Sequence, residues 1–88
     1  MTHIVEKLNE SLERLKNQSC LLNVDGPISF STKANLLDFN INECFELKLE
    51  IQNISLNINL SEMYSYKIEE ENIKLFLDGG NIVTLLKA

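Results

Sequence analysis

The chain of 88 residues contains no tryptophan, one proline, three glycines, two cysteines and one histidine. Two cysteines are too few for the disulfide framework of a small secreted domain. No apolar run approaches the roughly 20 residues that span a bilayer. The first residues also lack the basic and apolar regions of a secretory signal. We therefore expect a cytoplasmic protein with no membrane partner, in which Cys20 and Cys44 are reduced thiols.

Acidic side chains dominate the charge of the sequence. Thirteen Asp and Glu residues against eight Lys and Arg give a net charge of −5 and a pI near 4.7. Nucleic-acid binding normally requires a basic surface that displaces counterions from phosphates, so we expect no nucleic-acid partner. An acidic surface suits a basic protein partner. With 44% hydrophobic and 24% charged residues, the composition is that of a folded globular domain.

The N-terminal segment has the periodicity of a helix. Apolar residues recur at a spacing of three or four over residues 3–17, which places them on one face of a helix. This apolar set is Ile4, Val5, Leu8, Leu12 and Leu15.

After residue 19 the period changes to two, which is typical of strands. Residues 20–24 alternate, and Asp25-Gly26-Pro27 predicts a turn. A short second strand is expected over 28–31, followed by a polar loop at 31–33. Another strand is expected over 37–41, with Leu37, Phe39 and Ile41 on one face.

Residues 44–60 have the strongest alternation in the chain. A turn at Gln52-Asn53 would pair Leu49 with Leu56, so that every apolar residue of one strand faces an apolar residue of the other. A slip by one residue would break all of these matches together, so the register is well specified.

The last third of the sequence is less uniform. Residues 61–66 fit either a helical turn or a strand, and an acidic turn follows at 69–72. Residues 73–78 and 81–87 predict a hairpin around Gly79-Gly80, with Ile73 opposite Leu86 and Leu75 opposite Thr84. One face would then carry the apolar residues Phe76, Val83 and Leu85, and the other face would be apolar as well.

These elements predict one α+β domain over residues 1–88. Its N-terminal helix packs on an antiparallel sheet of about five or six strands, because a sheet of this size would otherwise leave an apolar face in water. Such a sheet is either strongly curved or closed into a small barrel.

Signals for chemistry are weak. His3 has no evident catalytic neighbour, and the carboxylates show neither calcium-loop spacing nor paired metal ligands. The only Gly pair lies in a hairpin rather than before a helix, so there is no phosphate-binding loop. We expect a non-enzymatic protein without metal or cofactor.

The doubly apolar last hairpin favours a protein-interaction module that self-associates. Phe76, Val83 and Leu85 are the candidate interface residues, since a monomer rarely exposes a large apolar patch. The abundance of residues with AT-rich codons is compatible with a bacterial mobile element or phage. Size and charge in that setting suggest an inhibitor, antitoxin or immunity-type role.

The alternative is a sheet-based binder of RNA or a small ligand that uses Tyr64 and Tyr66 for stacking. Asp38-Phe39-Asn40-Ile41-Asn42 resembles a signature of the Sm-like family, and residues 77–83 resemble that family's apolar–Arg-Gly hairpin. The resemblance implies a uridine pocket that includes Asp38 and Asn42. It departs from the family where Asp78 replaces the expected Arg and Thr32 the expected Gly.

Overall fold

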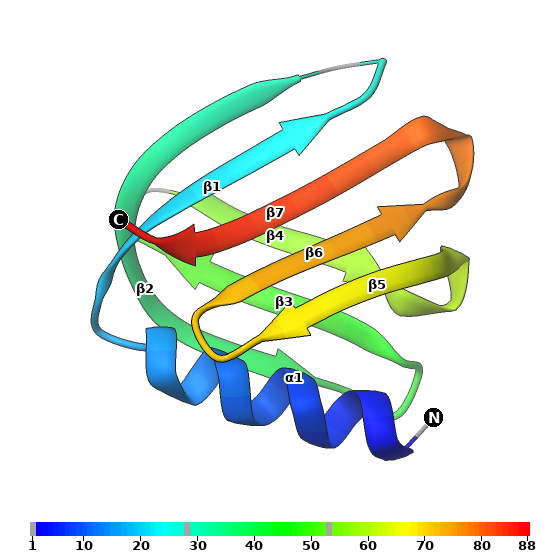
Figure 1. Ribbon diagram of the computed structural model, residues 1–88, viewed down its shortest axis with the longest axis horizontal. Helices are drawn as coiled ribbons and strands as arrows, with labels where there is room; N and C mark the ends of the chain where they lie inside the picture. The colour runs from blue at the N-terminus through cyan, green and yellow to red at the C-terminus, as the bar shows by residue number, and fades with distance from the viewer. Residues whose placement is uncertain (1, 28, 53) are drawn as a thin grey trace.

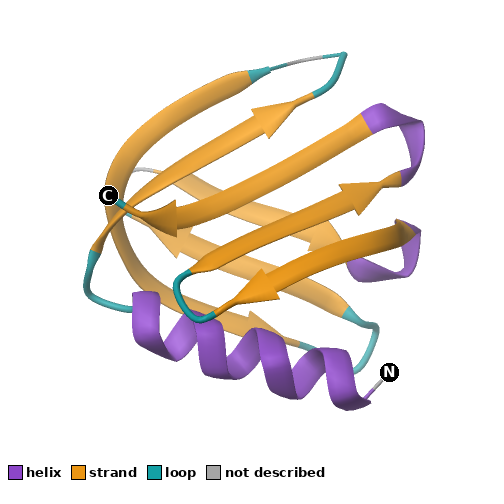
Figure 2. Cartoon of the chain, viewed as in Figure 1, coloured by secondary structure: helices purple, strands orange, loops and turns teal. Residues whose placement is uncertain are grey.

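The computed structural model describes residues 2–27, 29–52 and 54–88 as one helix and seven strands with two short 3-10 helices (Figures 1 and 2). In chain order these are α1 (Thr2–Leu15), β1 (Ser19–Asp25), β2 (Phe30–Ile41), β3 (Glu46–Ile51), β4 (Ile54–Asn59), η1 (Leu60–Glu62), β5 (Met63–Glu69), β6 (Asn72–Leu77), η2 (Asp78–Gly80) and β7 (Asn81–Lys87).

All seven strands form one antiparallel sheet in the order β4-β3-β2-β1-β7-β6-β5. Figure 1 shows the sheet curled into two layers, with β5, β6, β7 and β1 in front and β3 and β4 behind. The expected α+β class is thus confirmed, with more strands than the five or six predicted. The sheet is strongly curved but not closed into a barrel, because β4 and β5 lie at opposite ends of the strand order.

β2 connects the two layers. Its first half pairs with β1, from Phe30 to Asn35, and its second half pairs with β3, from Leu36 onward. The register shifts between Leu36 and Asp38, where a bulge turns the strand. The predicted loop at 31–33 is therefore wrong, because these residues belong to one continuous strand. The bulge also leaves Leu37 exposed rather than on the apolar face with Phe39 and Ile41.

α1 closes the lower end of the curled sheet in Figure 1. Leu8, Leu12 and Leu15 are fully buried, and the helix contacts β2, β5 and β6. The helix ends at Leu15, two residues before the predicted end. Asn17 follows with a φ of 64°, and its backbone N–H donates to the Leu36 carbonyl. Within the described ranges, no helix is long and apolar enough to cross a membrane.

The β3–β4 hairpin has the predicted register. Leu47 faces Ile58, Leu49 faces Leu56 and Ile51 faces Ile54. The expected turn residue Asn53 lies outside the described residues, as does Ile28 of the short second strand expected over 28–31.

The β6–β7 hairpin is shifted by one residue from the prediction. Asp78, Gly79 and Gly80 form a three-residue connection in η2, with φ values of 84° and 81° at the glycines. Leu77 therefore faces Asn81, Leu75 faces Val83 and Ile73 faces Leu85. The predicted two-residue turn, which paired Ile73 with Leu86, is wrong.

Candidate interaction surface

The shifted register moves two candidate interface residues into the core. Val83 and Leu85 are 5% and 2% exposed and lie on the inner face with Ile73 and Leu75. Phe76 is the one candidate interface residue on the outer face, where it is half-buried opposite Ile82. Val83 and Leu85 therefore lie on the opposite side of the sheet from Phe76, so the three candidate residues do not form one surface.

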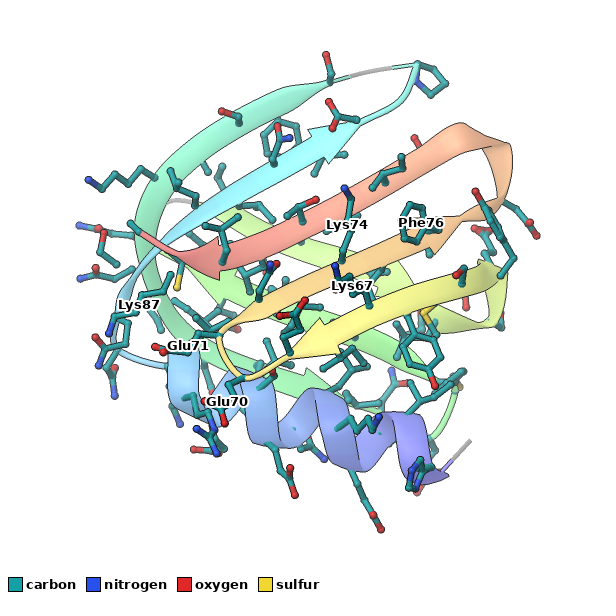
Figure 3. All side chains as sticks on the ribbon, viewed as in Figure 1. Lys67, Glu70, Glu71, Lys74, Phe76 and Lys87 are labelled. Carbon is teal, nitrogen blue, oxygen red and sulfur yellow. The ribbon has the colours of Figure 1, made fainter. Side chains whose placement is uncertain are left out.

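Phe76 lies in a small aromatic and cationic cluster. The Tyr64 ring centroid lies 6.3 Å from that of Phe76, at an interplanar angle of 45°. The Lys74 ammonium lies 5.7 Å from the Phe76 ring centroid, within the range of a cation–π contact (Figure 3). Tyr64 is 66% exposed, so this contact leaves most of its ring in water.

The outward positions of the neighbouring strands add two apolar pairs, and the polar residues Asn23, Thr84 and Lys74 lie between these pairs. Leu86 of β7 lies opposite Leu21 of β1, and Ile82 of β7 lies opposite Phe76 of β6. Leu21 is 39% exposed, and Ile82 and Leu86 are partly exposed. We call these five residues together the apolar outer face: Leu21, Tyr64, Phe76, Ile82 and Leu86.

Few charges lie beside the apolar outer face, and they nearly balance. Lys33, Lys67 and Lys74 occupy outward positions, as do Asp25 and Glu69. Lys67 Nζ lies 3.4 Å from a Glu69 carboxylate oxygen, although both side chains are more than half exposed. The net charge of −5 is therefore carried by other parts of the molecule.

The predicted tyrosine pair does not form one binding surface. A register shift between Met63 and Ser65 places Tyr64 beside Phe76 on the outer face. Tyr66 lies opposite the buried Leu75 and so belongs to the inner face, where it is 38% exposed at the sheet edge. The two rings therefore point to opposite sides of the sheet.

The two stretches that resemble the Sm-like family lie apart. The connection after β2 lies at the lower right of Figure 1 and η2 at the upper right. Asp38 forms an ion pair of 3.5 Å with Lys16. The Asn42 side-chain oxygen accepts from the backbone N–H groups of Cys44 and Glu46, which shapes the β2–β3 turn. Both side chains thus have local structural partners.

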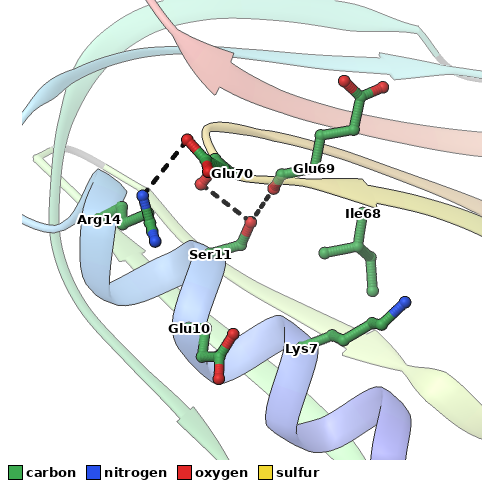
Figure 4. Close-up of a pocket in the computed structure, with 7 residues that line it drawn as sticks. All are labelled: Lys7, Glu10, Ser11, Arg14, Ile68, Glu69 and Glu70. Atoms are coloured by element: carbon green, nitrogen blue, oxygen red, sulfur yellow. Dashed lines mark hydrogen bonds and ion pairs between the residues drawn. The ribbon is translucent and has the colours of Figure 1, made fainter.

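A polar pocket of about 290 Å3 lies between α1 and the β5–β6 turn (Figure 4). The Ser11 hydroxyl, on a residue that is 3% exposed, donates to the carbonyls of Glu69 and Glu70, and the distance to Glu70 is 3.1 Å. Arg14 forms a 3.4 Å ion pair with the Glu70 carboxylate. These contacts attach the helix to the edge of the sheet, so the polar groups have structural partners.

A second depression, a groove of about 340 Å3, lies between β4 and the ends of β1, β6 and β7. Val24, Leu77 and Val83 line it from one layer and Leu56 and Ile58 from the other. All five occupy inner positions of the sheet. Sequence analysis missed this groove, because it depends on the gap that remains where the curled sheet does not close.

The two cysteines are free and have different surroundings. Cys20 is 2% exposed, and burial raises the pKa of its thiol above the usual 9.0. Its thiol lies 3.4 Å from the Gln18 carbonyl oxygen. Cys44 is exposed in the β2–β3 turn. Among the described residues, no group of three or more His, Cys, Asp or Glu side chains is arranged to hold a metal ion.

Comparison with known proteins gives no family for this chain. No protein-family model matches it, and searches of curated proteins and of solved structures found no significant match.

Proposed function

We propose that this chain is a small acidic, non-enzymatic protein-interaction module that self-associates through the apolar outer face. One observation carries the proposal. Leu21, Phe76, Ile82 and Leu86 occupy outward cross-strand positions on strands whose inward side chains already fill the core. Leu21 is 39% exposed and Phe76, Ile82 and Leu86 are half-buried, so a partner on this face would bury the apolar area that remains in water.

The distribution of charge supports contact between two copies. A chain with a net charge of −5 repels its own copies when its acidic surfaces meet. The apolar outer face has nearly balanced charges beside it, so two copies can approach there with little repulsion. Phe76 is the anchor in this proposal, because buried aromatic side chains contribute much of the energy of an interface.

A basic protein is the second partner that the charge favours. Asp38, Glu46 and Glu50 occupy outward positions on β2 and β3, with Lys48 between them and Lys16 paired with Asp38. A self-associating module with such an acidic side suits an inhibitor, antitoxin or immunity-type protein of a bacterial mobile element or phage, acting in the cytoplasm.

Sedimentation across a concentration series tests the proposal. Phe76→Glu should remain folded and lower the mass of the assembly, because it places a charge within the contact. Asn40→Glu adds the same charge at an exposed position of β2, outside the apolar outer face, and should leave the mass unchanged. A wild-type chain that sediments at 10.1 kDa at every concentration would contradict the proposal.

A further inference from the structure

The two edges of the open sheet differ in how they are protected. The β5 edge has a bulge between Met63 and Ser65 and carries Lys67 and Glu69. α1 contacts β5, and Ser11 binds the backbone carbonyls at its end. Bulges, charged side chains and a covering helix are the means by which edge strands avoid pairing with other chains.

The β4 edge has none of these protections. Of the seven strands that the structure describes, β4 alone contains no charged residue; its sequence is Ile54-Ser55-Leu56-Asn57-Ile58-Asn59. Its pairing with β3 runs from Ile54 to Asn59 without a bulge. Such a regular neutral strand in a chain with 24% charged residues is a template for strand addition.

The backbone of β4 is oriented for such an addition. The Leu60 N–H donates to the Phe45 carbonyl, so Leu60 and, by alternation, Ile58 and Leu56 direct their backbone groups toward β3. Ser55 and Asn57 direct theirs toward the free edge. The groove of about 340 Å3 lies beside this strand and is lined by Leu56 and Ile58.

We propose that β4 is a dimerisation edge, which pairs antiparallel with β4 of a second copy about a two-fold axis. This inference rests on the proposed self-association. It places a second contact between two copies at the β4 edge, separate from the apolar outer face. A two-fold axis places a residue near the middle of β4 opposite or diagonally next to the same residue of the second copy, so a charge there would lie close to a like charge. β4 meets this condition because its outward side chains are Ser55, Asn57 and Asn59.

Of the registers that preserve the inner and outer faces of both strands, two pair the most residues of β4. One places Asn57 opposite Asn57 of the second copy, and the other places Asn57 opposite Ser55. In both, the apolar row Ile54, Leu56 and Ile58 faces the same row of the second copy. The added strand extends the sheet beside the groove, so its inward side chains cover the apolar lining.

Asn57→Lys tests the pairing. The Asn57→Lys substitution is added to a chain that already carries Phe76→Glu, so contact through the apolar outer face is already removed in this double variant. Phe76→Glu alone should sediment at twice the chain mass of 10.1 kDa, and the double variant at the single chain mass. Asn40→Lys, in place of Asn57→Lys, adds the same charge on the same side of the sheet but two strands from the edge, and should leave the dimer intact. Mixing Asn57→Lys with Asn57→Glu chains should restore the dimer, because the opposite charges then lie directly opposite in one register and diagonally adjacent in the other.

Amide hydrogen exchange gives a readout specific to β4. In the dimer the Ser55 N–H is hydrogen-bonded to the second copy, and Asn57→Lys should speed its exchange at least tenfold without changing exchange in β1. A Phe76→Glu chain that is folded but monomeric at every concentration, while the wild type associates, would overturn the β4 edge alone. A monomeric wild type would overturn both proposals. If Phe76→Glu fails to fold, Leu21→Glu replaces it, since Leu21 is 39% exposed on the same face.

Discussion

The two outer faces of the curled sheet differ in chemistry, although the strands of both alternate between inward and outward residues. On β5, β6, β7 and β1 the outward side chains include Leu21, Phe76, Ile82 and Leu86. On β2, β3 and β4 they are polar or charged except for Leu37, which is 47% exposed at the bulge. The polar and charged set is Asp38, Asn40, Glu46, Lys48, Glu50, Ser55, Asn57 and Asn59. Inward positions are mostly apolar in both layers, with Thr32 of β2 as an exception, so the core is formed by inward side chains. The apolar residues on one outer face therefore point to a role beyond stability.

The largest expected effect separates the inner and outer positions of β7. Val83→Asp should unfold the domain, because it buries an unpaired charge and a domain of this size is stable by only about 5–15 kcal/mol. Thr84→Asp should change the free energy of unfolding by about 1 kcal/mol or less, since Thr84 points outward opposite Lys74. Urea titration followed by circular dichroism measures both. The reverse ranking would contradict the register of the β6–β7 hairpin.

A smaller effect is expected where the helix joins the edge of the sheet. Ser11→Ala should lower the free energy of unfolding by roughly 1–3 kcal/mol, because the carbonyls of Glu69 and Glu70 lose their donor inside the fold. Arg14→Gln removes the nearby ion pair with Glu70 and should cost less than about 1 kcal/mol, since both side chains are mostly exposed. Equal losses in chemical denaturation would mean that the hydroxyl has no special role.

Salt should affect the two proposed kinds of binding in opposite directions. Raising the salt concentration from about 0.05 M to about 0.5 M screens repulsion between acidic chains and should tighten self-association several-fold. Binding of a basic protein to the outward acidic residues of β2 and β3 should weaken as the salt concentration rises over the same range. Sedimentation equilibrium at both concentrations measures the first effect. Weaker self-association in high salt would show that the contact is held by opposite charges rather than by apolar residues.

The smallest expected effect concerns the cysteines. Reductant should leave the melting temperature unchanged, because both thiols are free. A thiol reagent should modify the exposed Cys44 first. Cys20 should react only after unfolding, because it is buried and its raised pKa keeps the thiol protonated at neutral pH. Mass spectrometry during labelling counts the modified thiols, and equal rates in the folded protein would contradict the buried position of Cys20.

The strand periodicity predicts the β3–β4 hairpin correctly because its apolar and polar residues alternate without exception. It fails for β2, where the polar run Ser31-Thr32-Lys33 suggests a loop. Thr32 is in fact an inward residue opposite Leu22, at a position where the core does not demand a larger side chain. The bulge at Leu37 then exchanges the inward and outward positions along the rest of β2. A pattern of period two does not predict such a change.

The β6–β7 hairpin shows a different limit. Residues 73–77 and 81–87 are apolar at both parities, so alternation does not choose the register, and the connection decides it. A Gly-Gly pair suggests a two-residue turn, whereas the structure uses three residues with Asp78 included. Matching apolar residues across the hairpin would have favoured the observed register, in which Leu75 pairs with Val83 rather than with Thr84. The sequence therefore identifies Phe76 as a candidate interface residue, but it does not show which residues lie on the same face as Phe76.

The position of β7 has a consequence for how the protein is made. β7 is the last strand in chain order, yet it lies between β1 and β6 in the sheet. During synthesis the first six strands can form only two separate sheets, β4-β3-β2-β1 and β6-β5, since nothing else joins them. The open edges of β1 and β6 are then exposed to other chains and to chaperones until the ribosome releases β7. The two sets of strands thus become one sheet only once β7 has been translated.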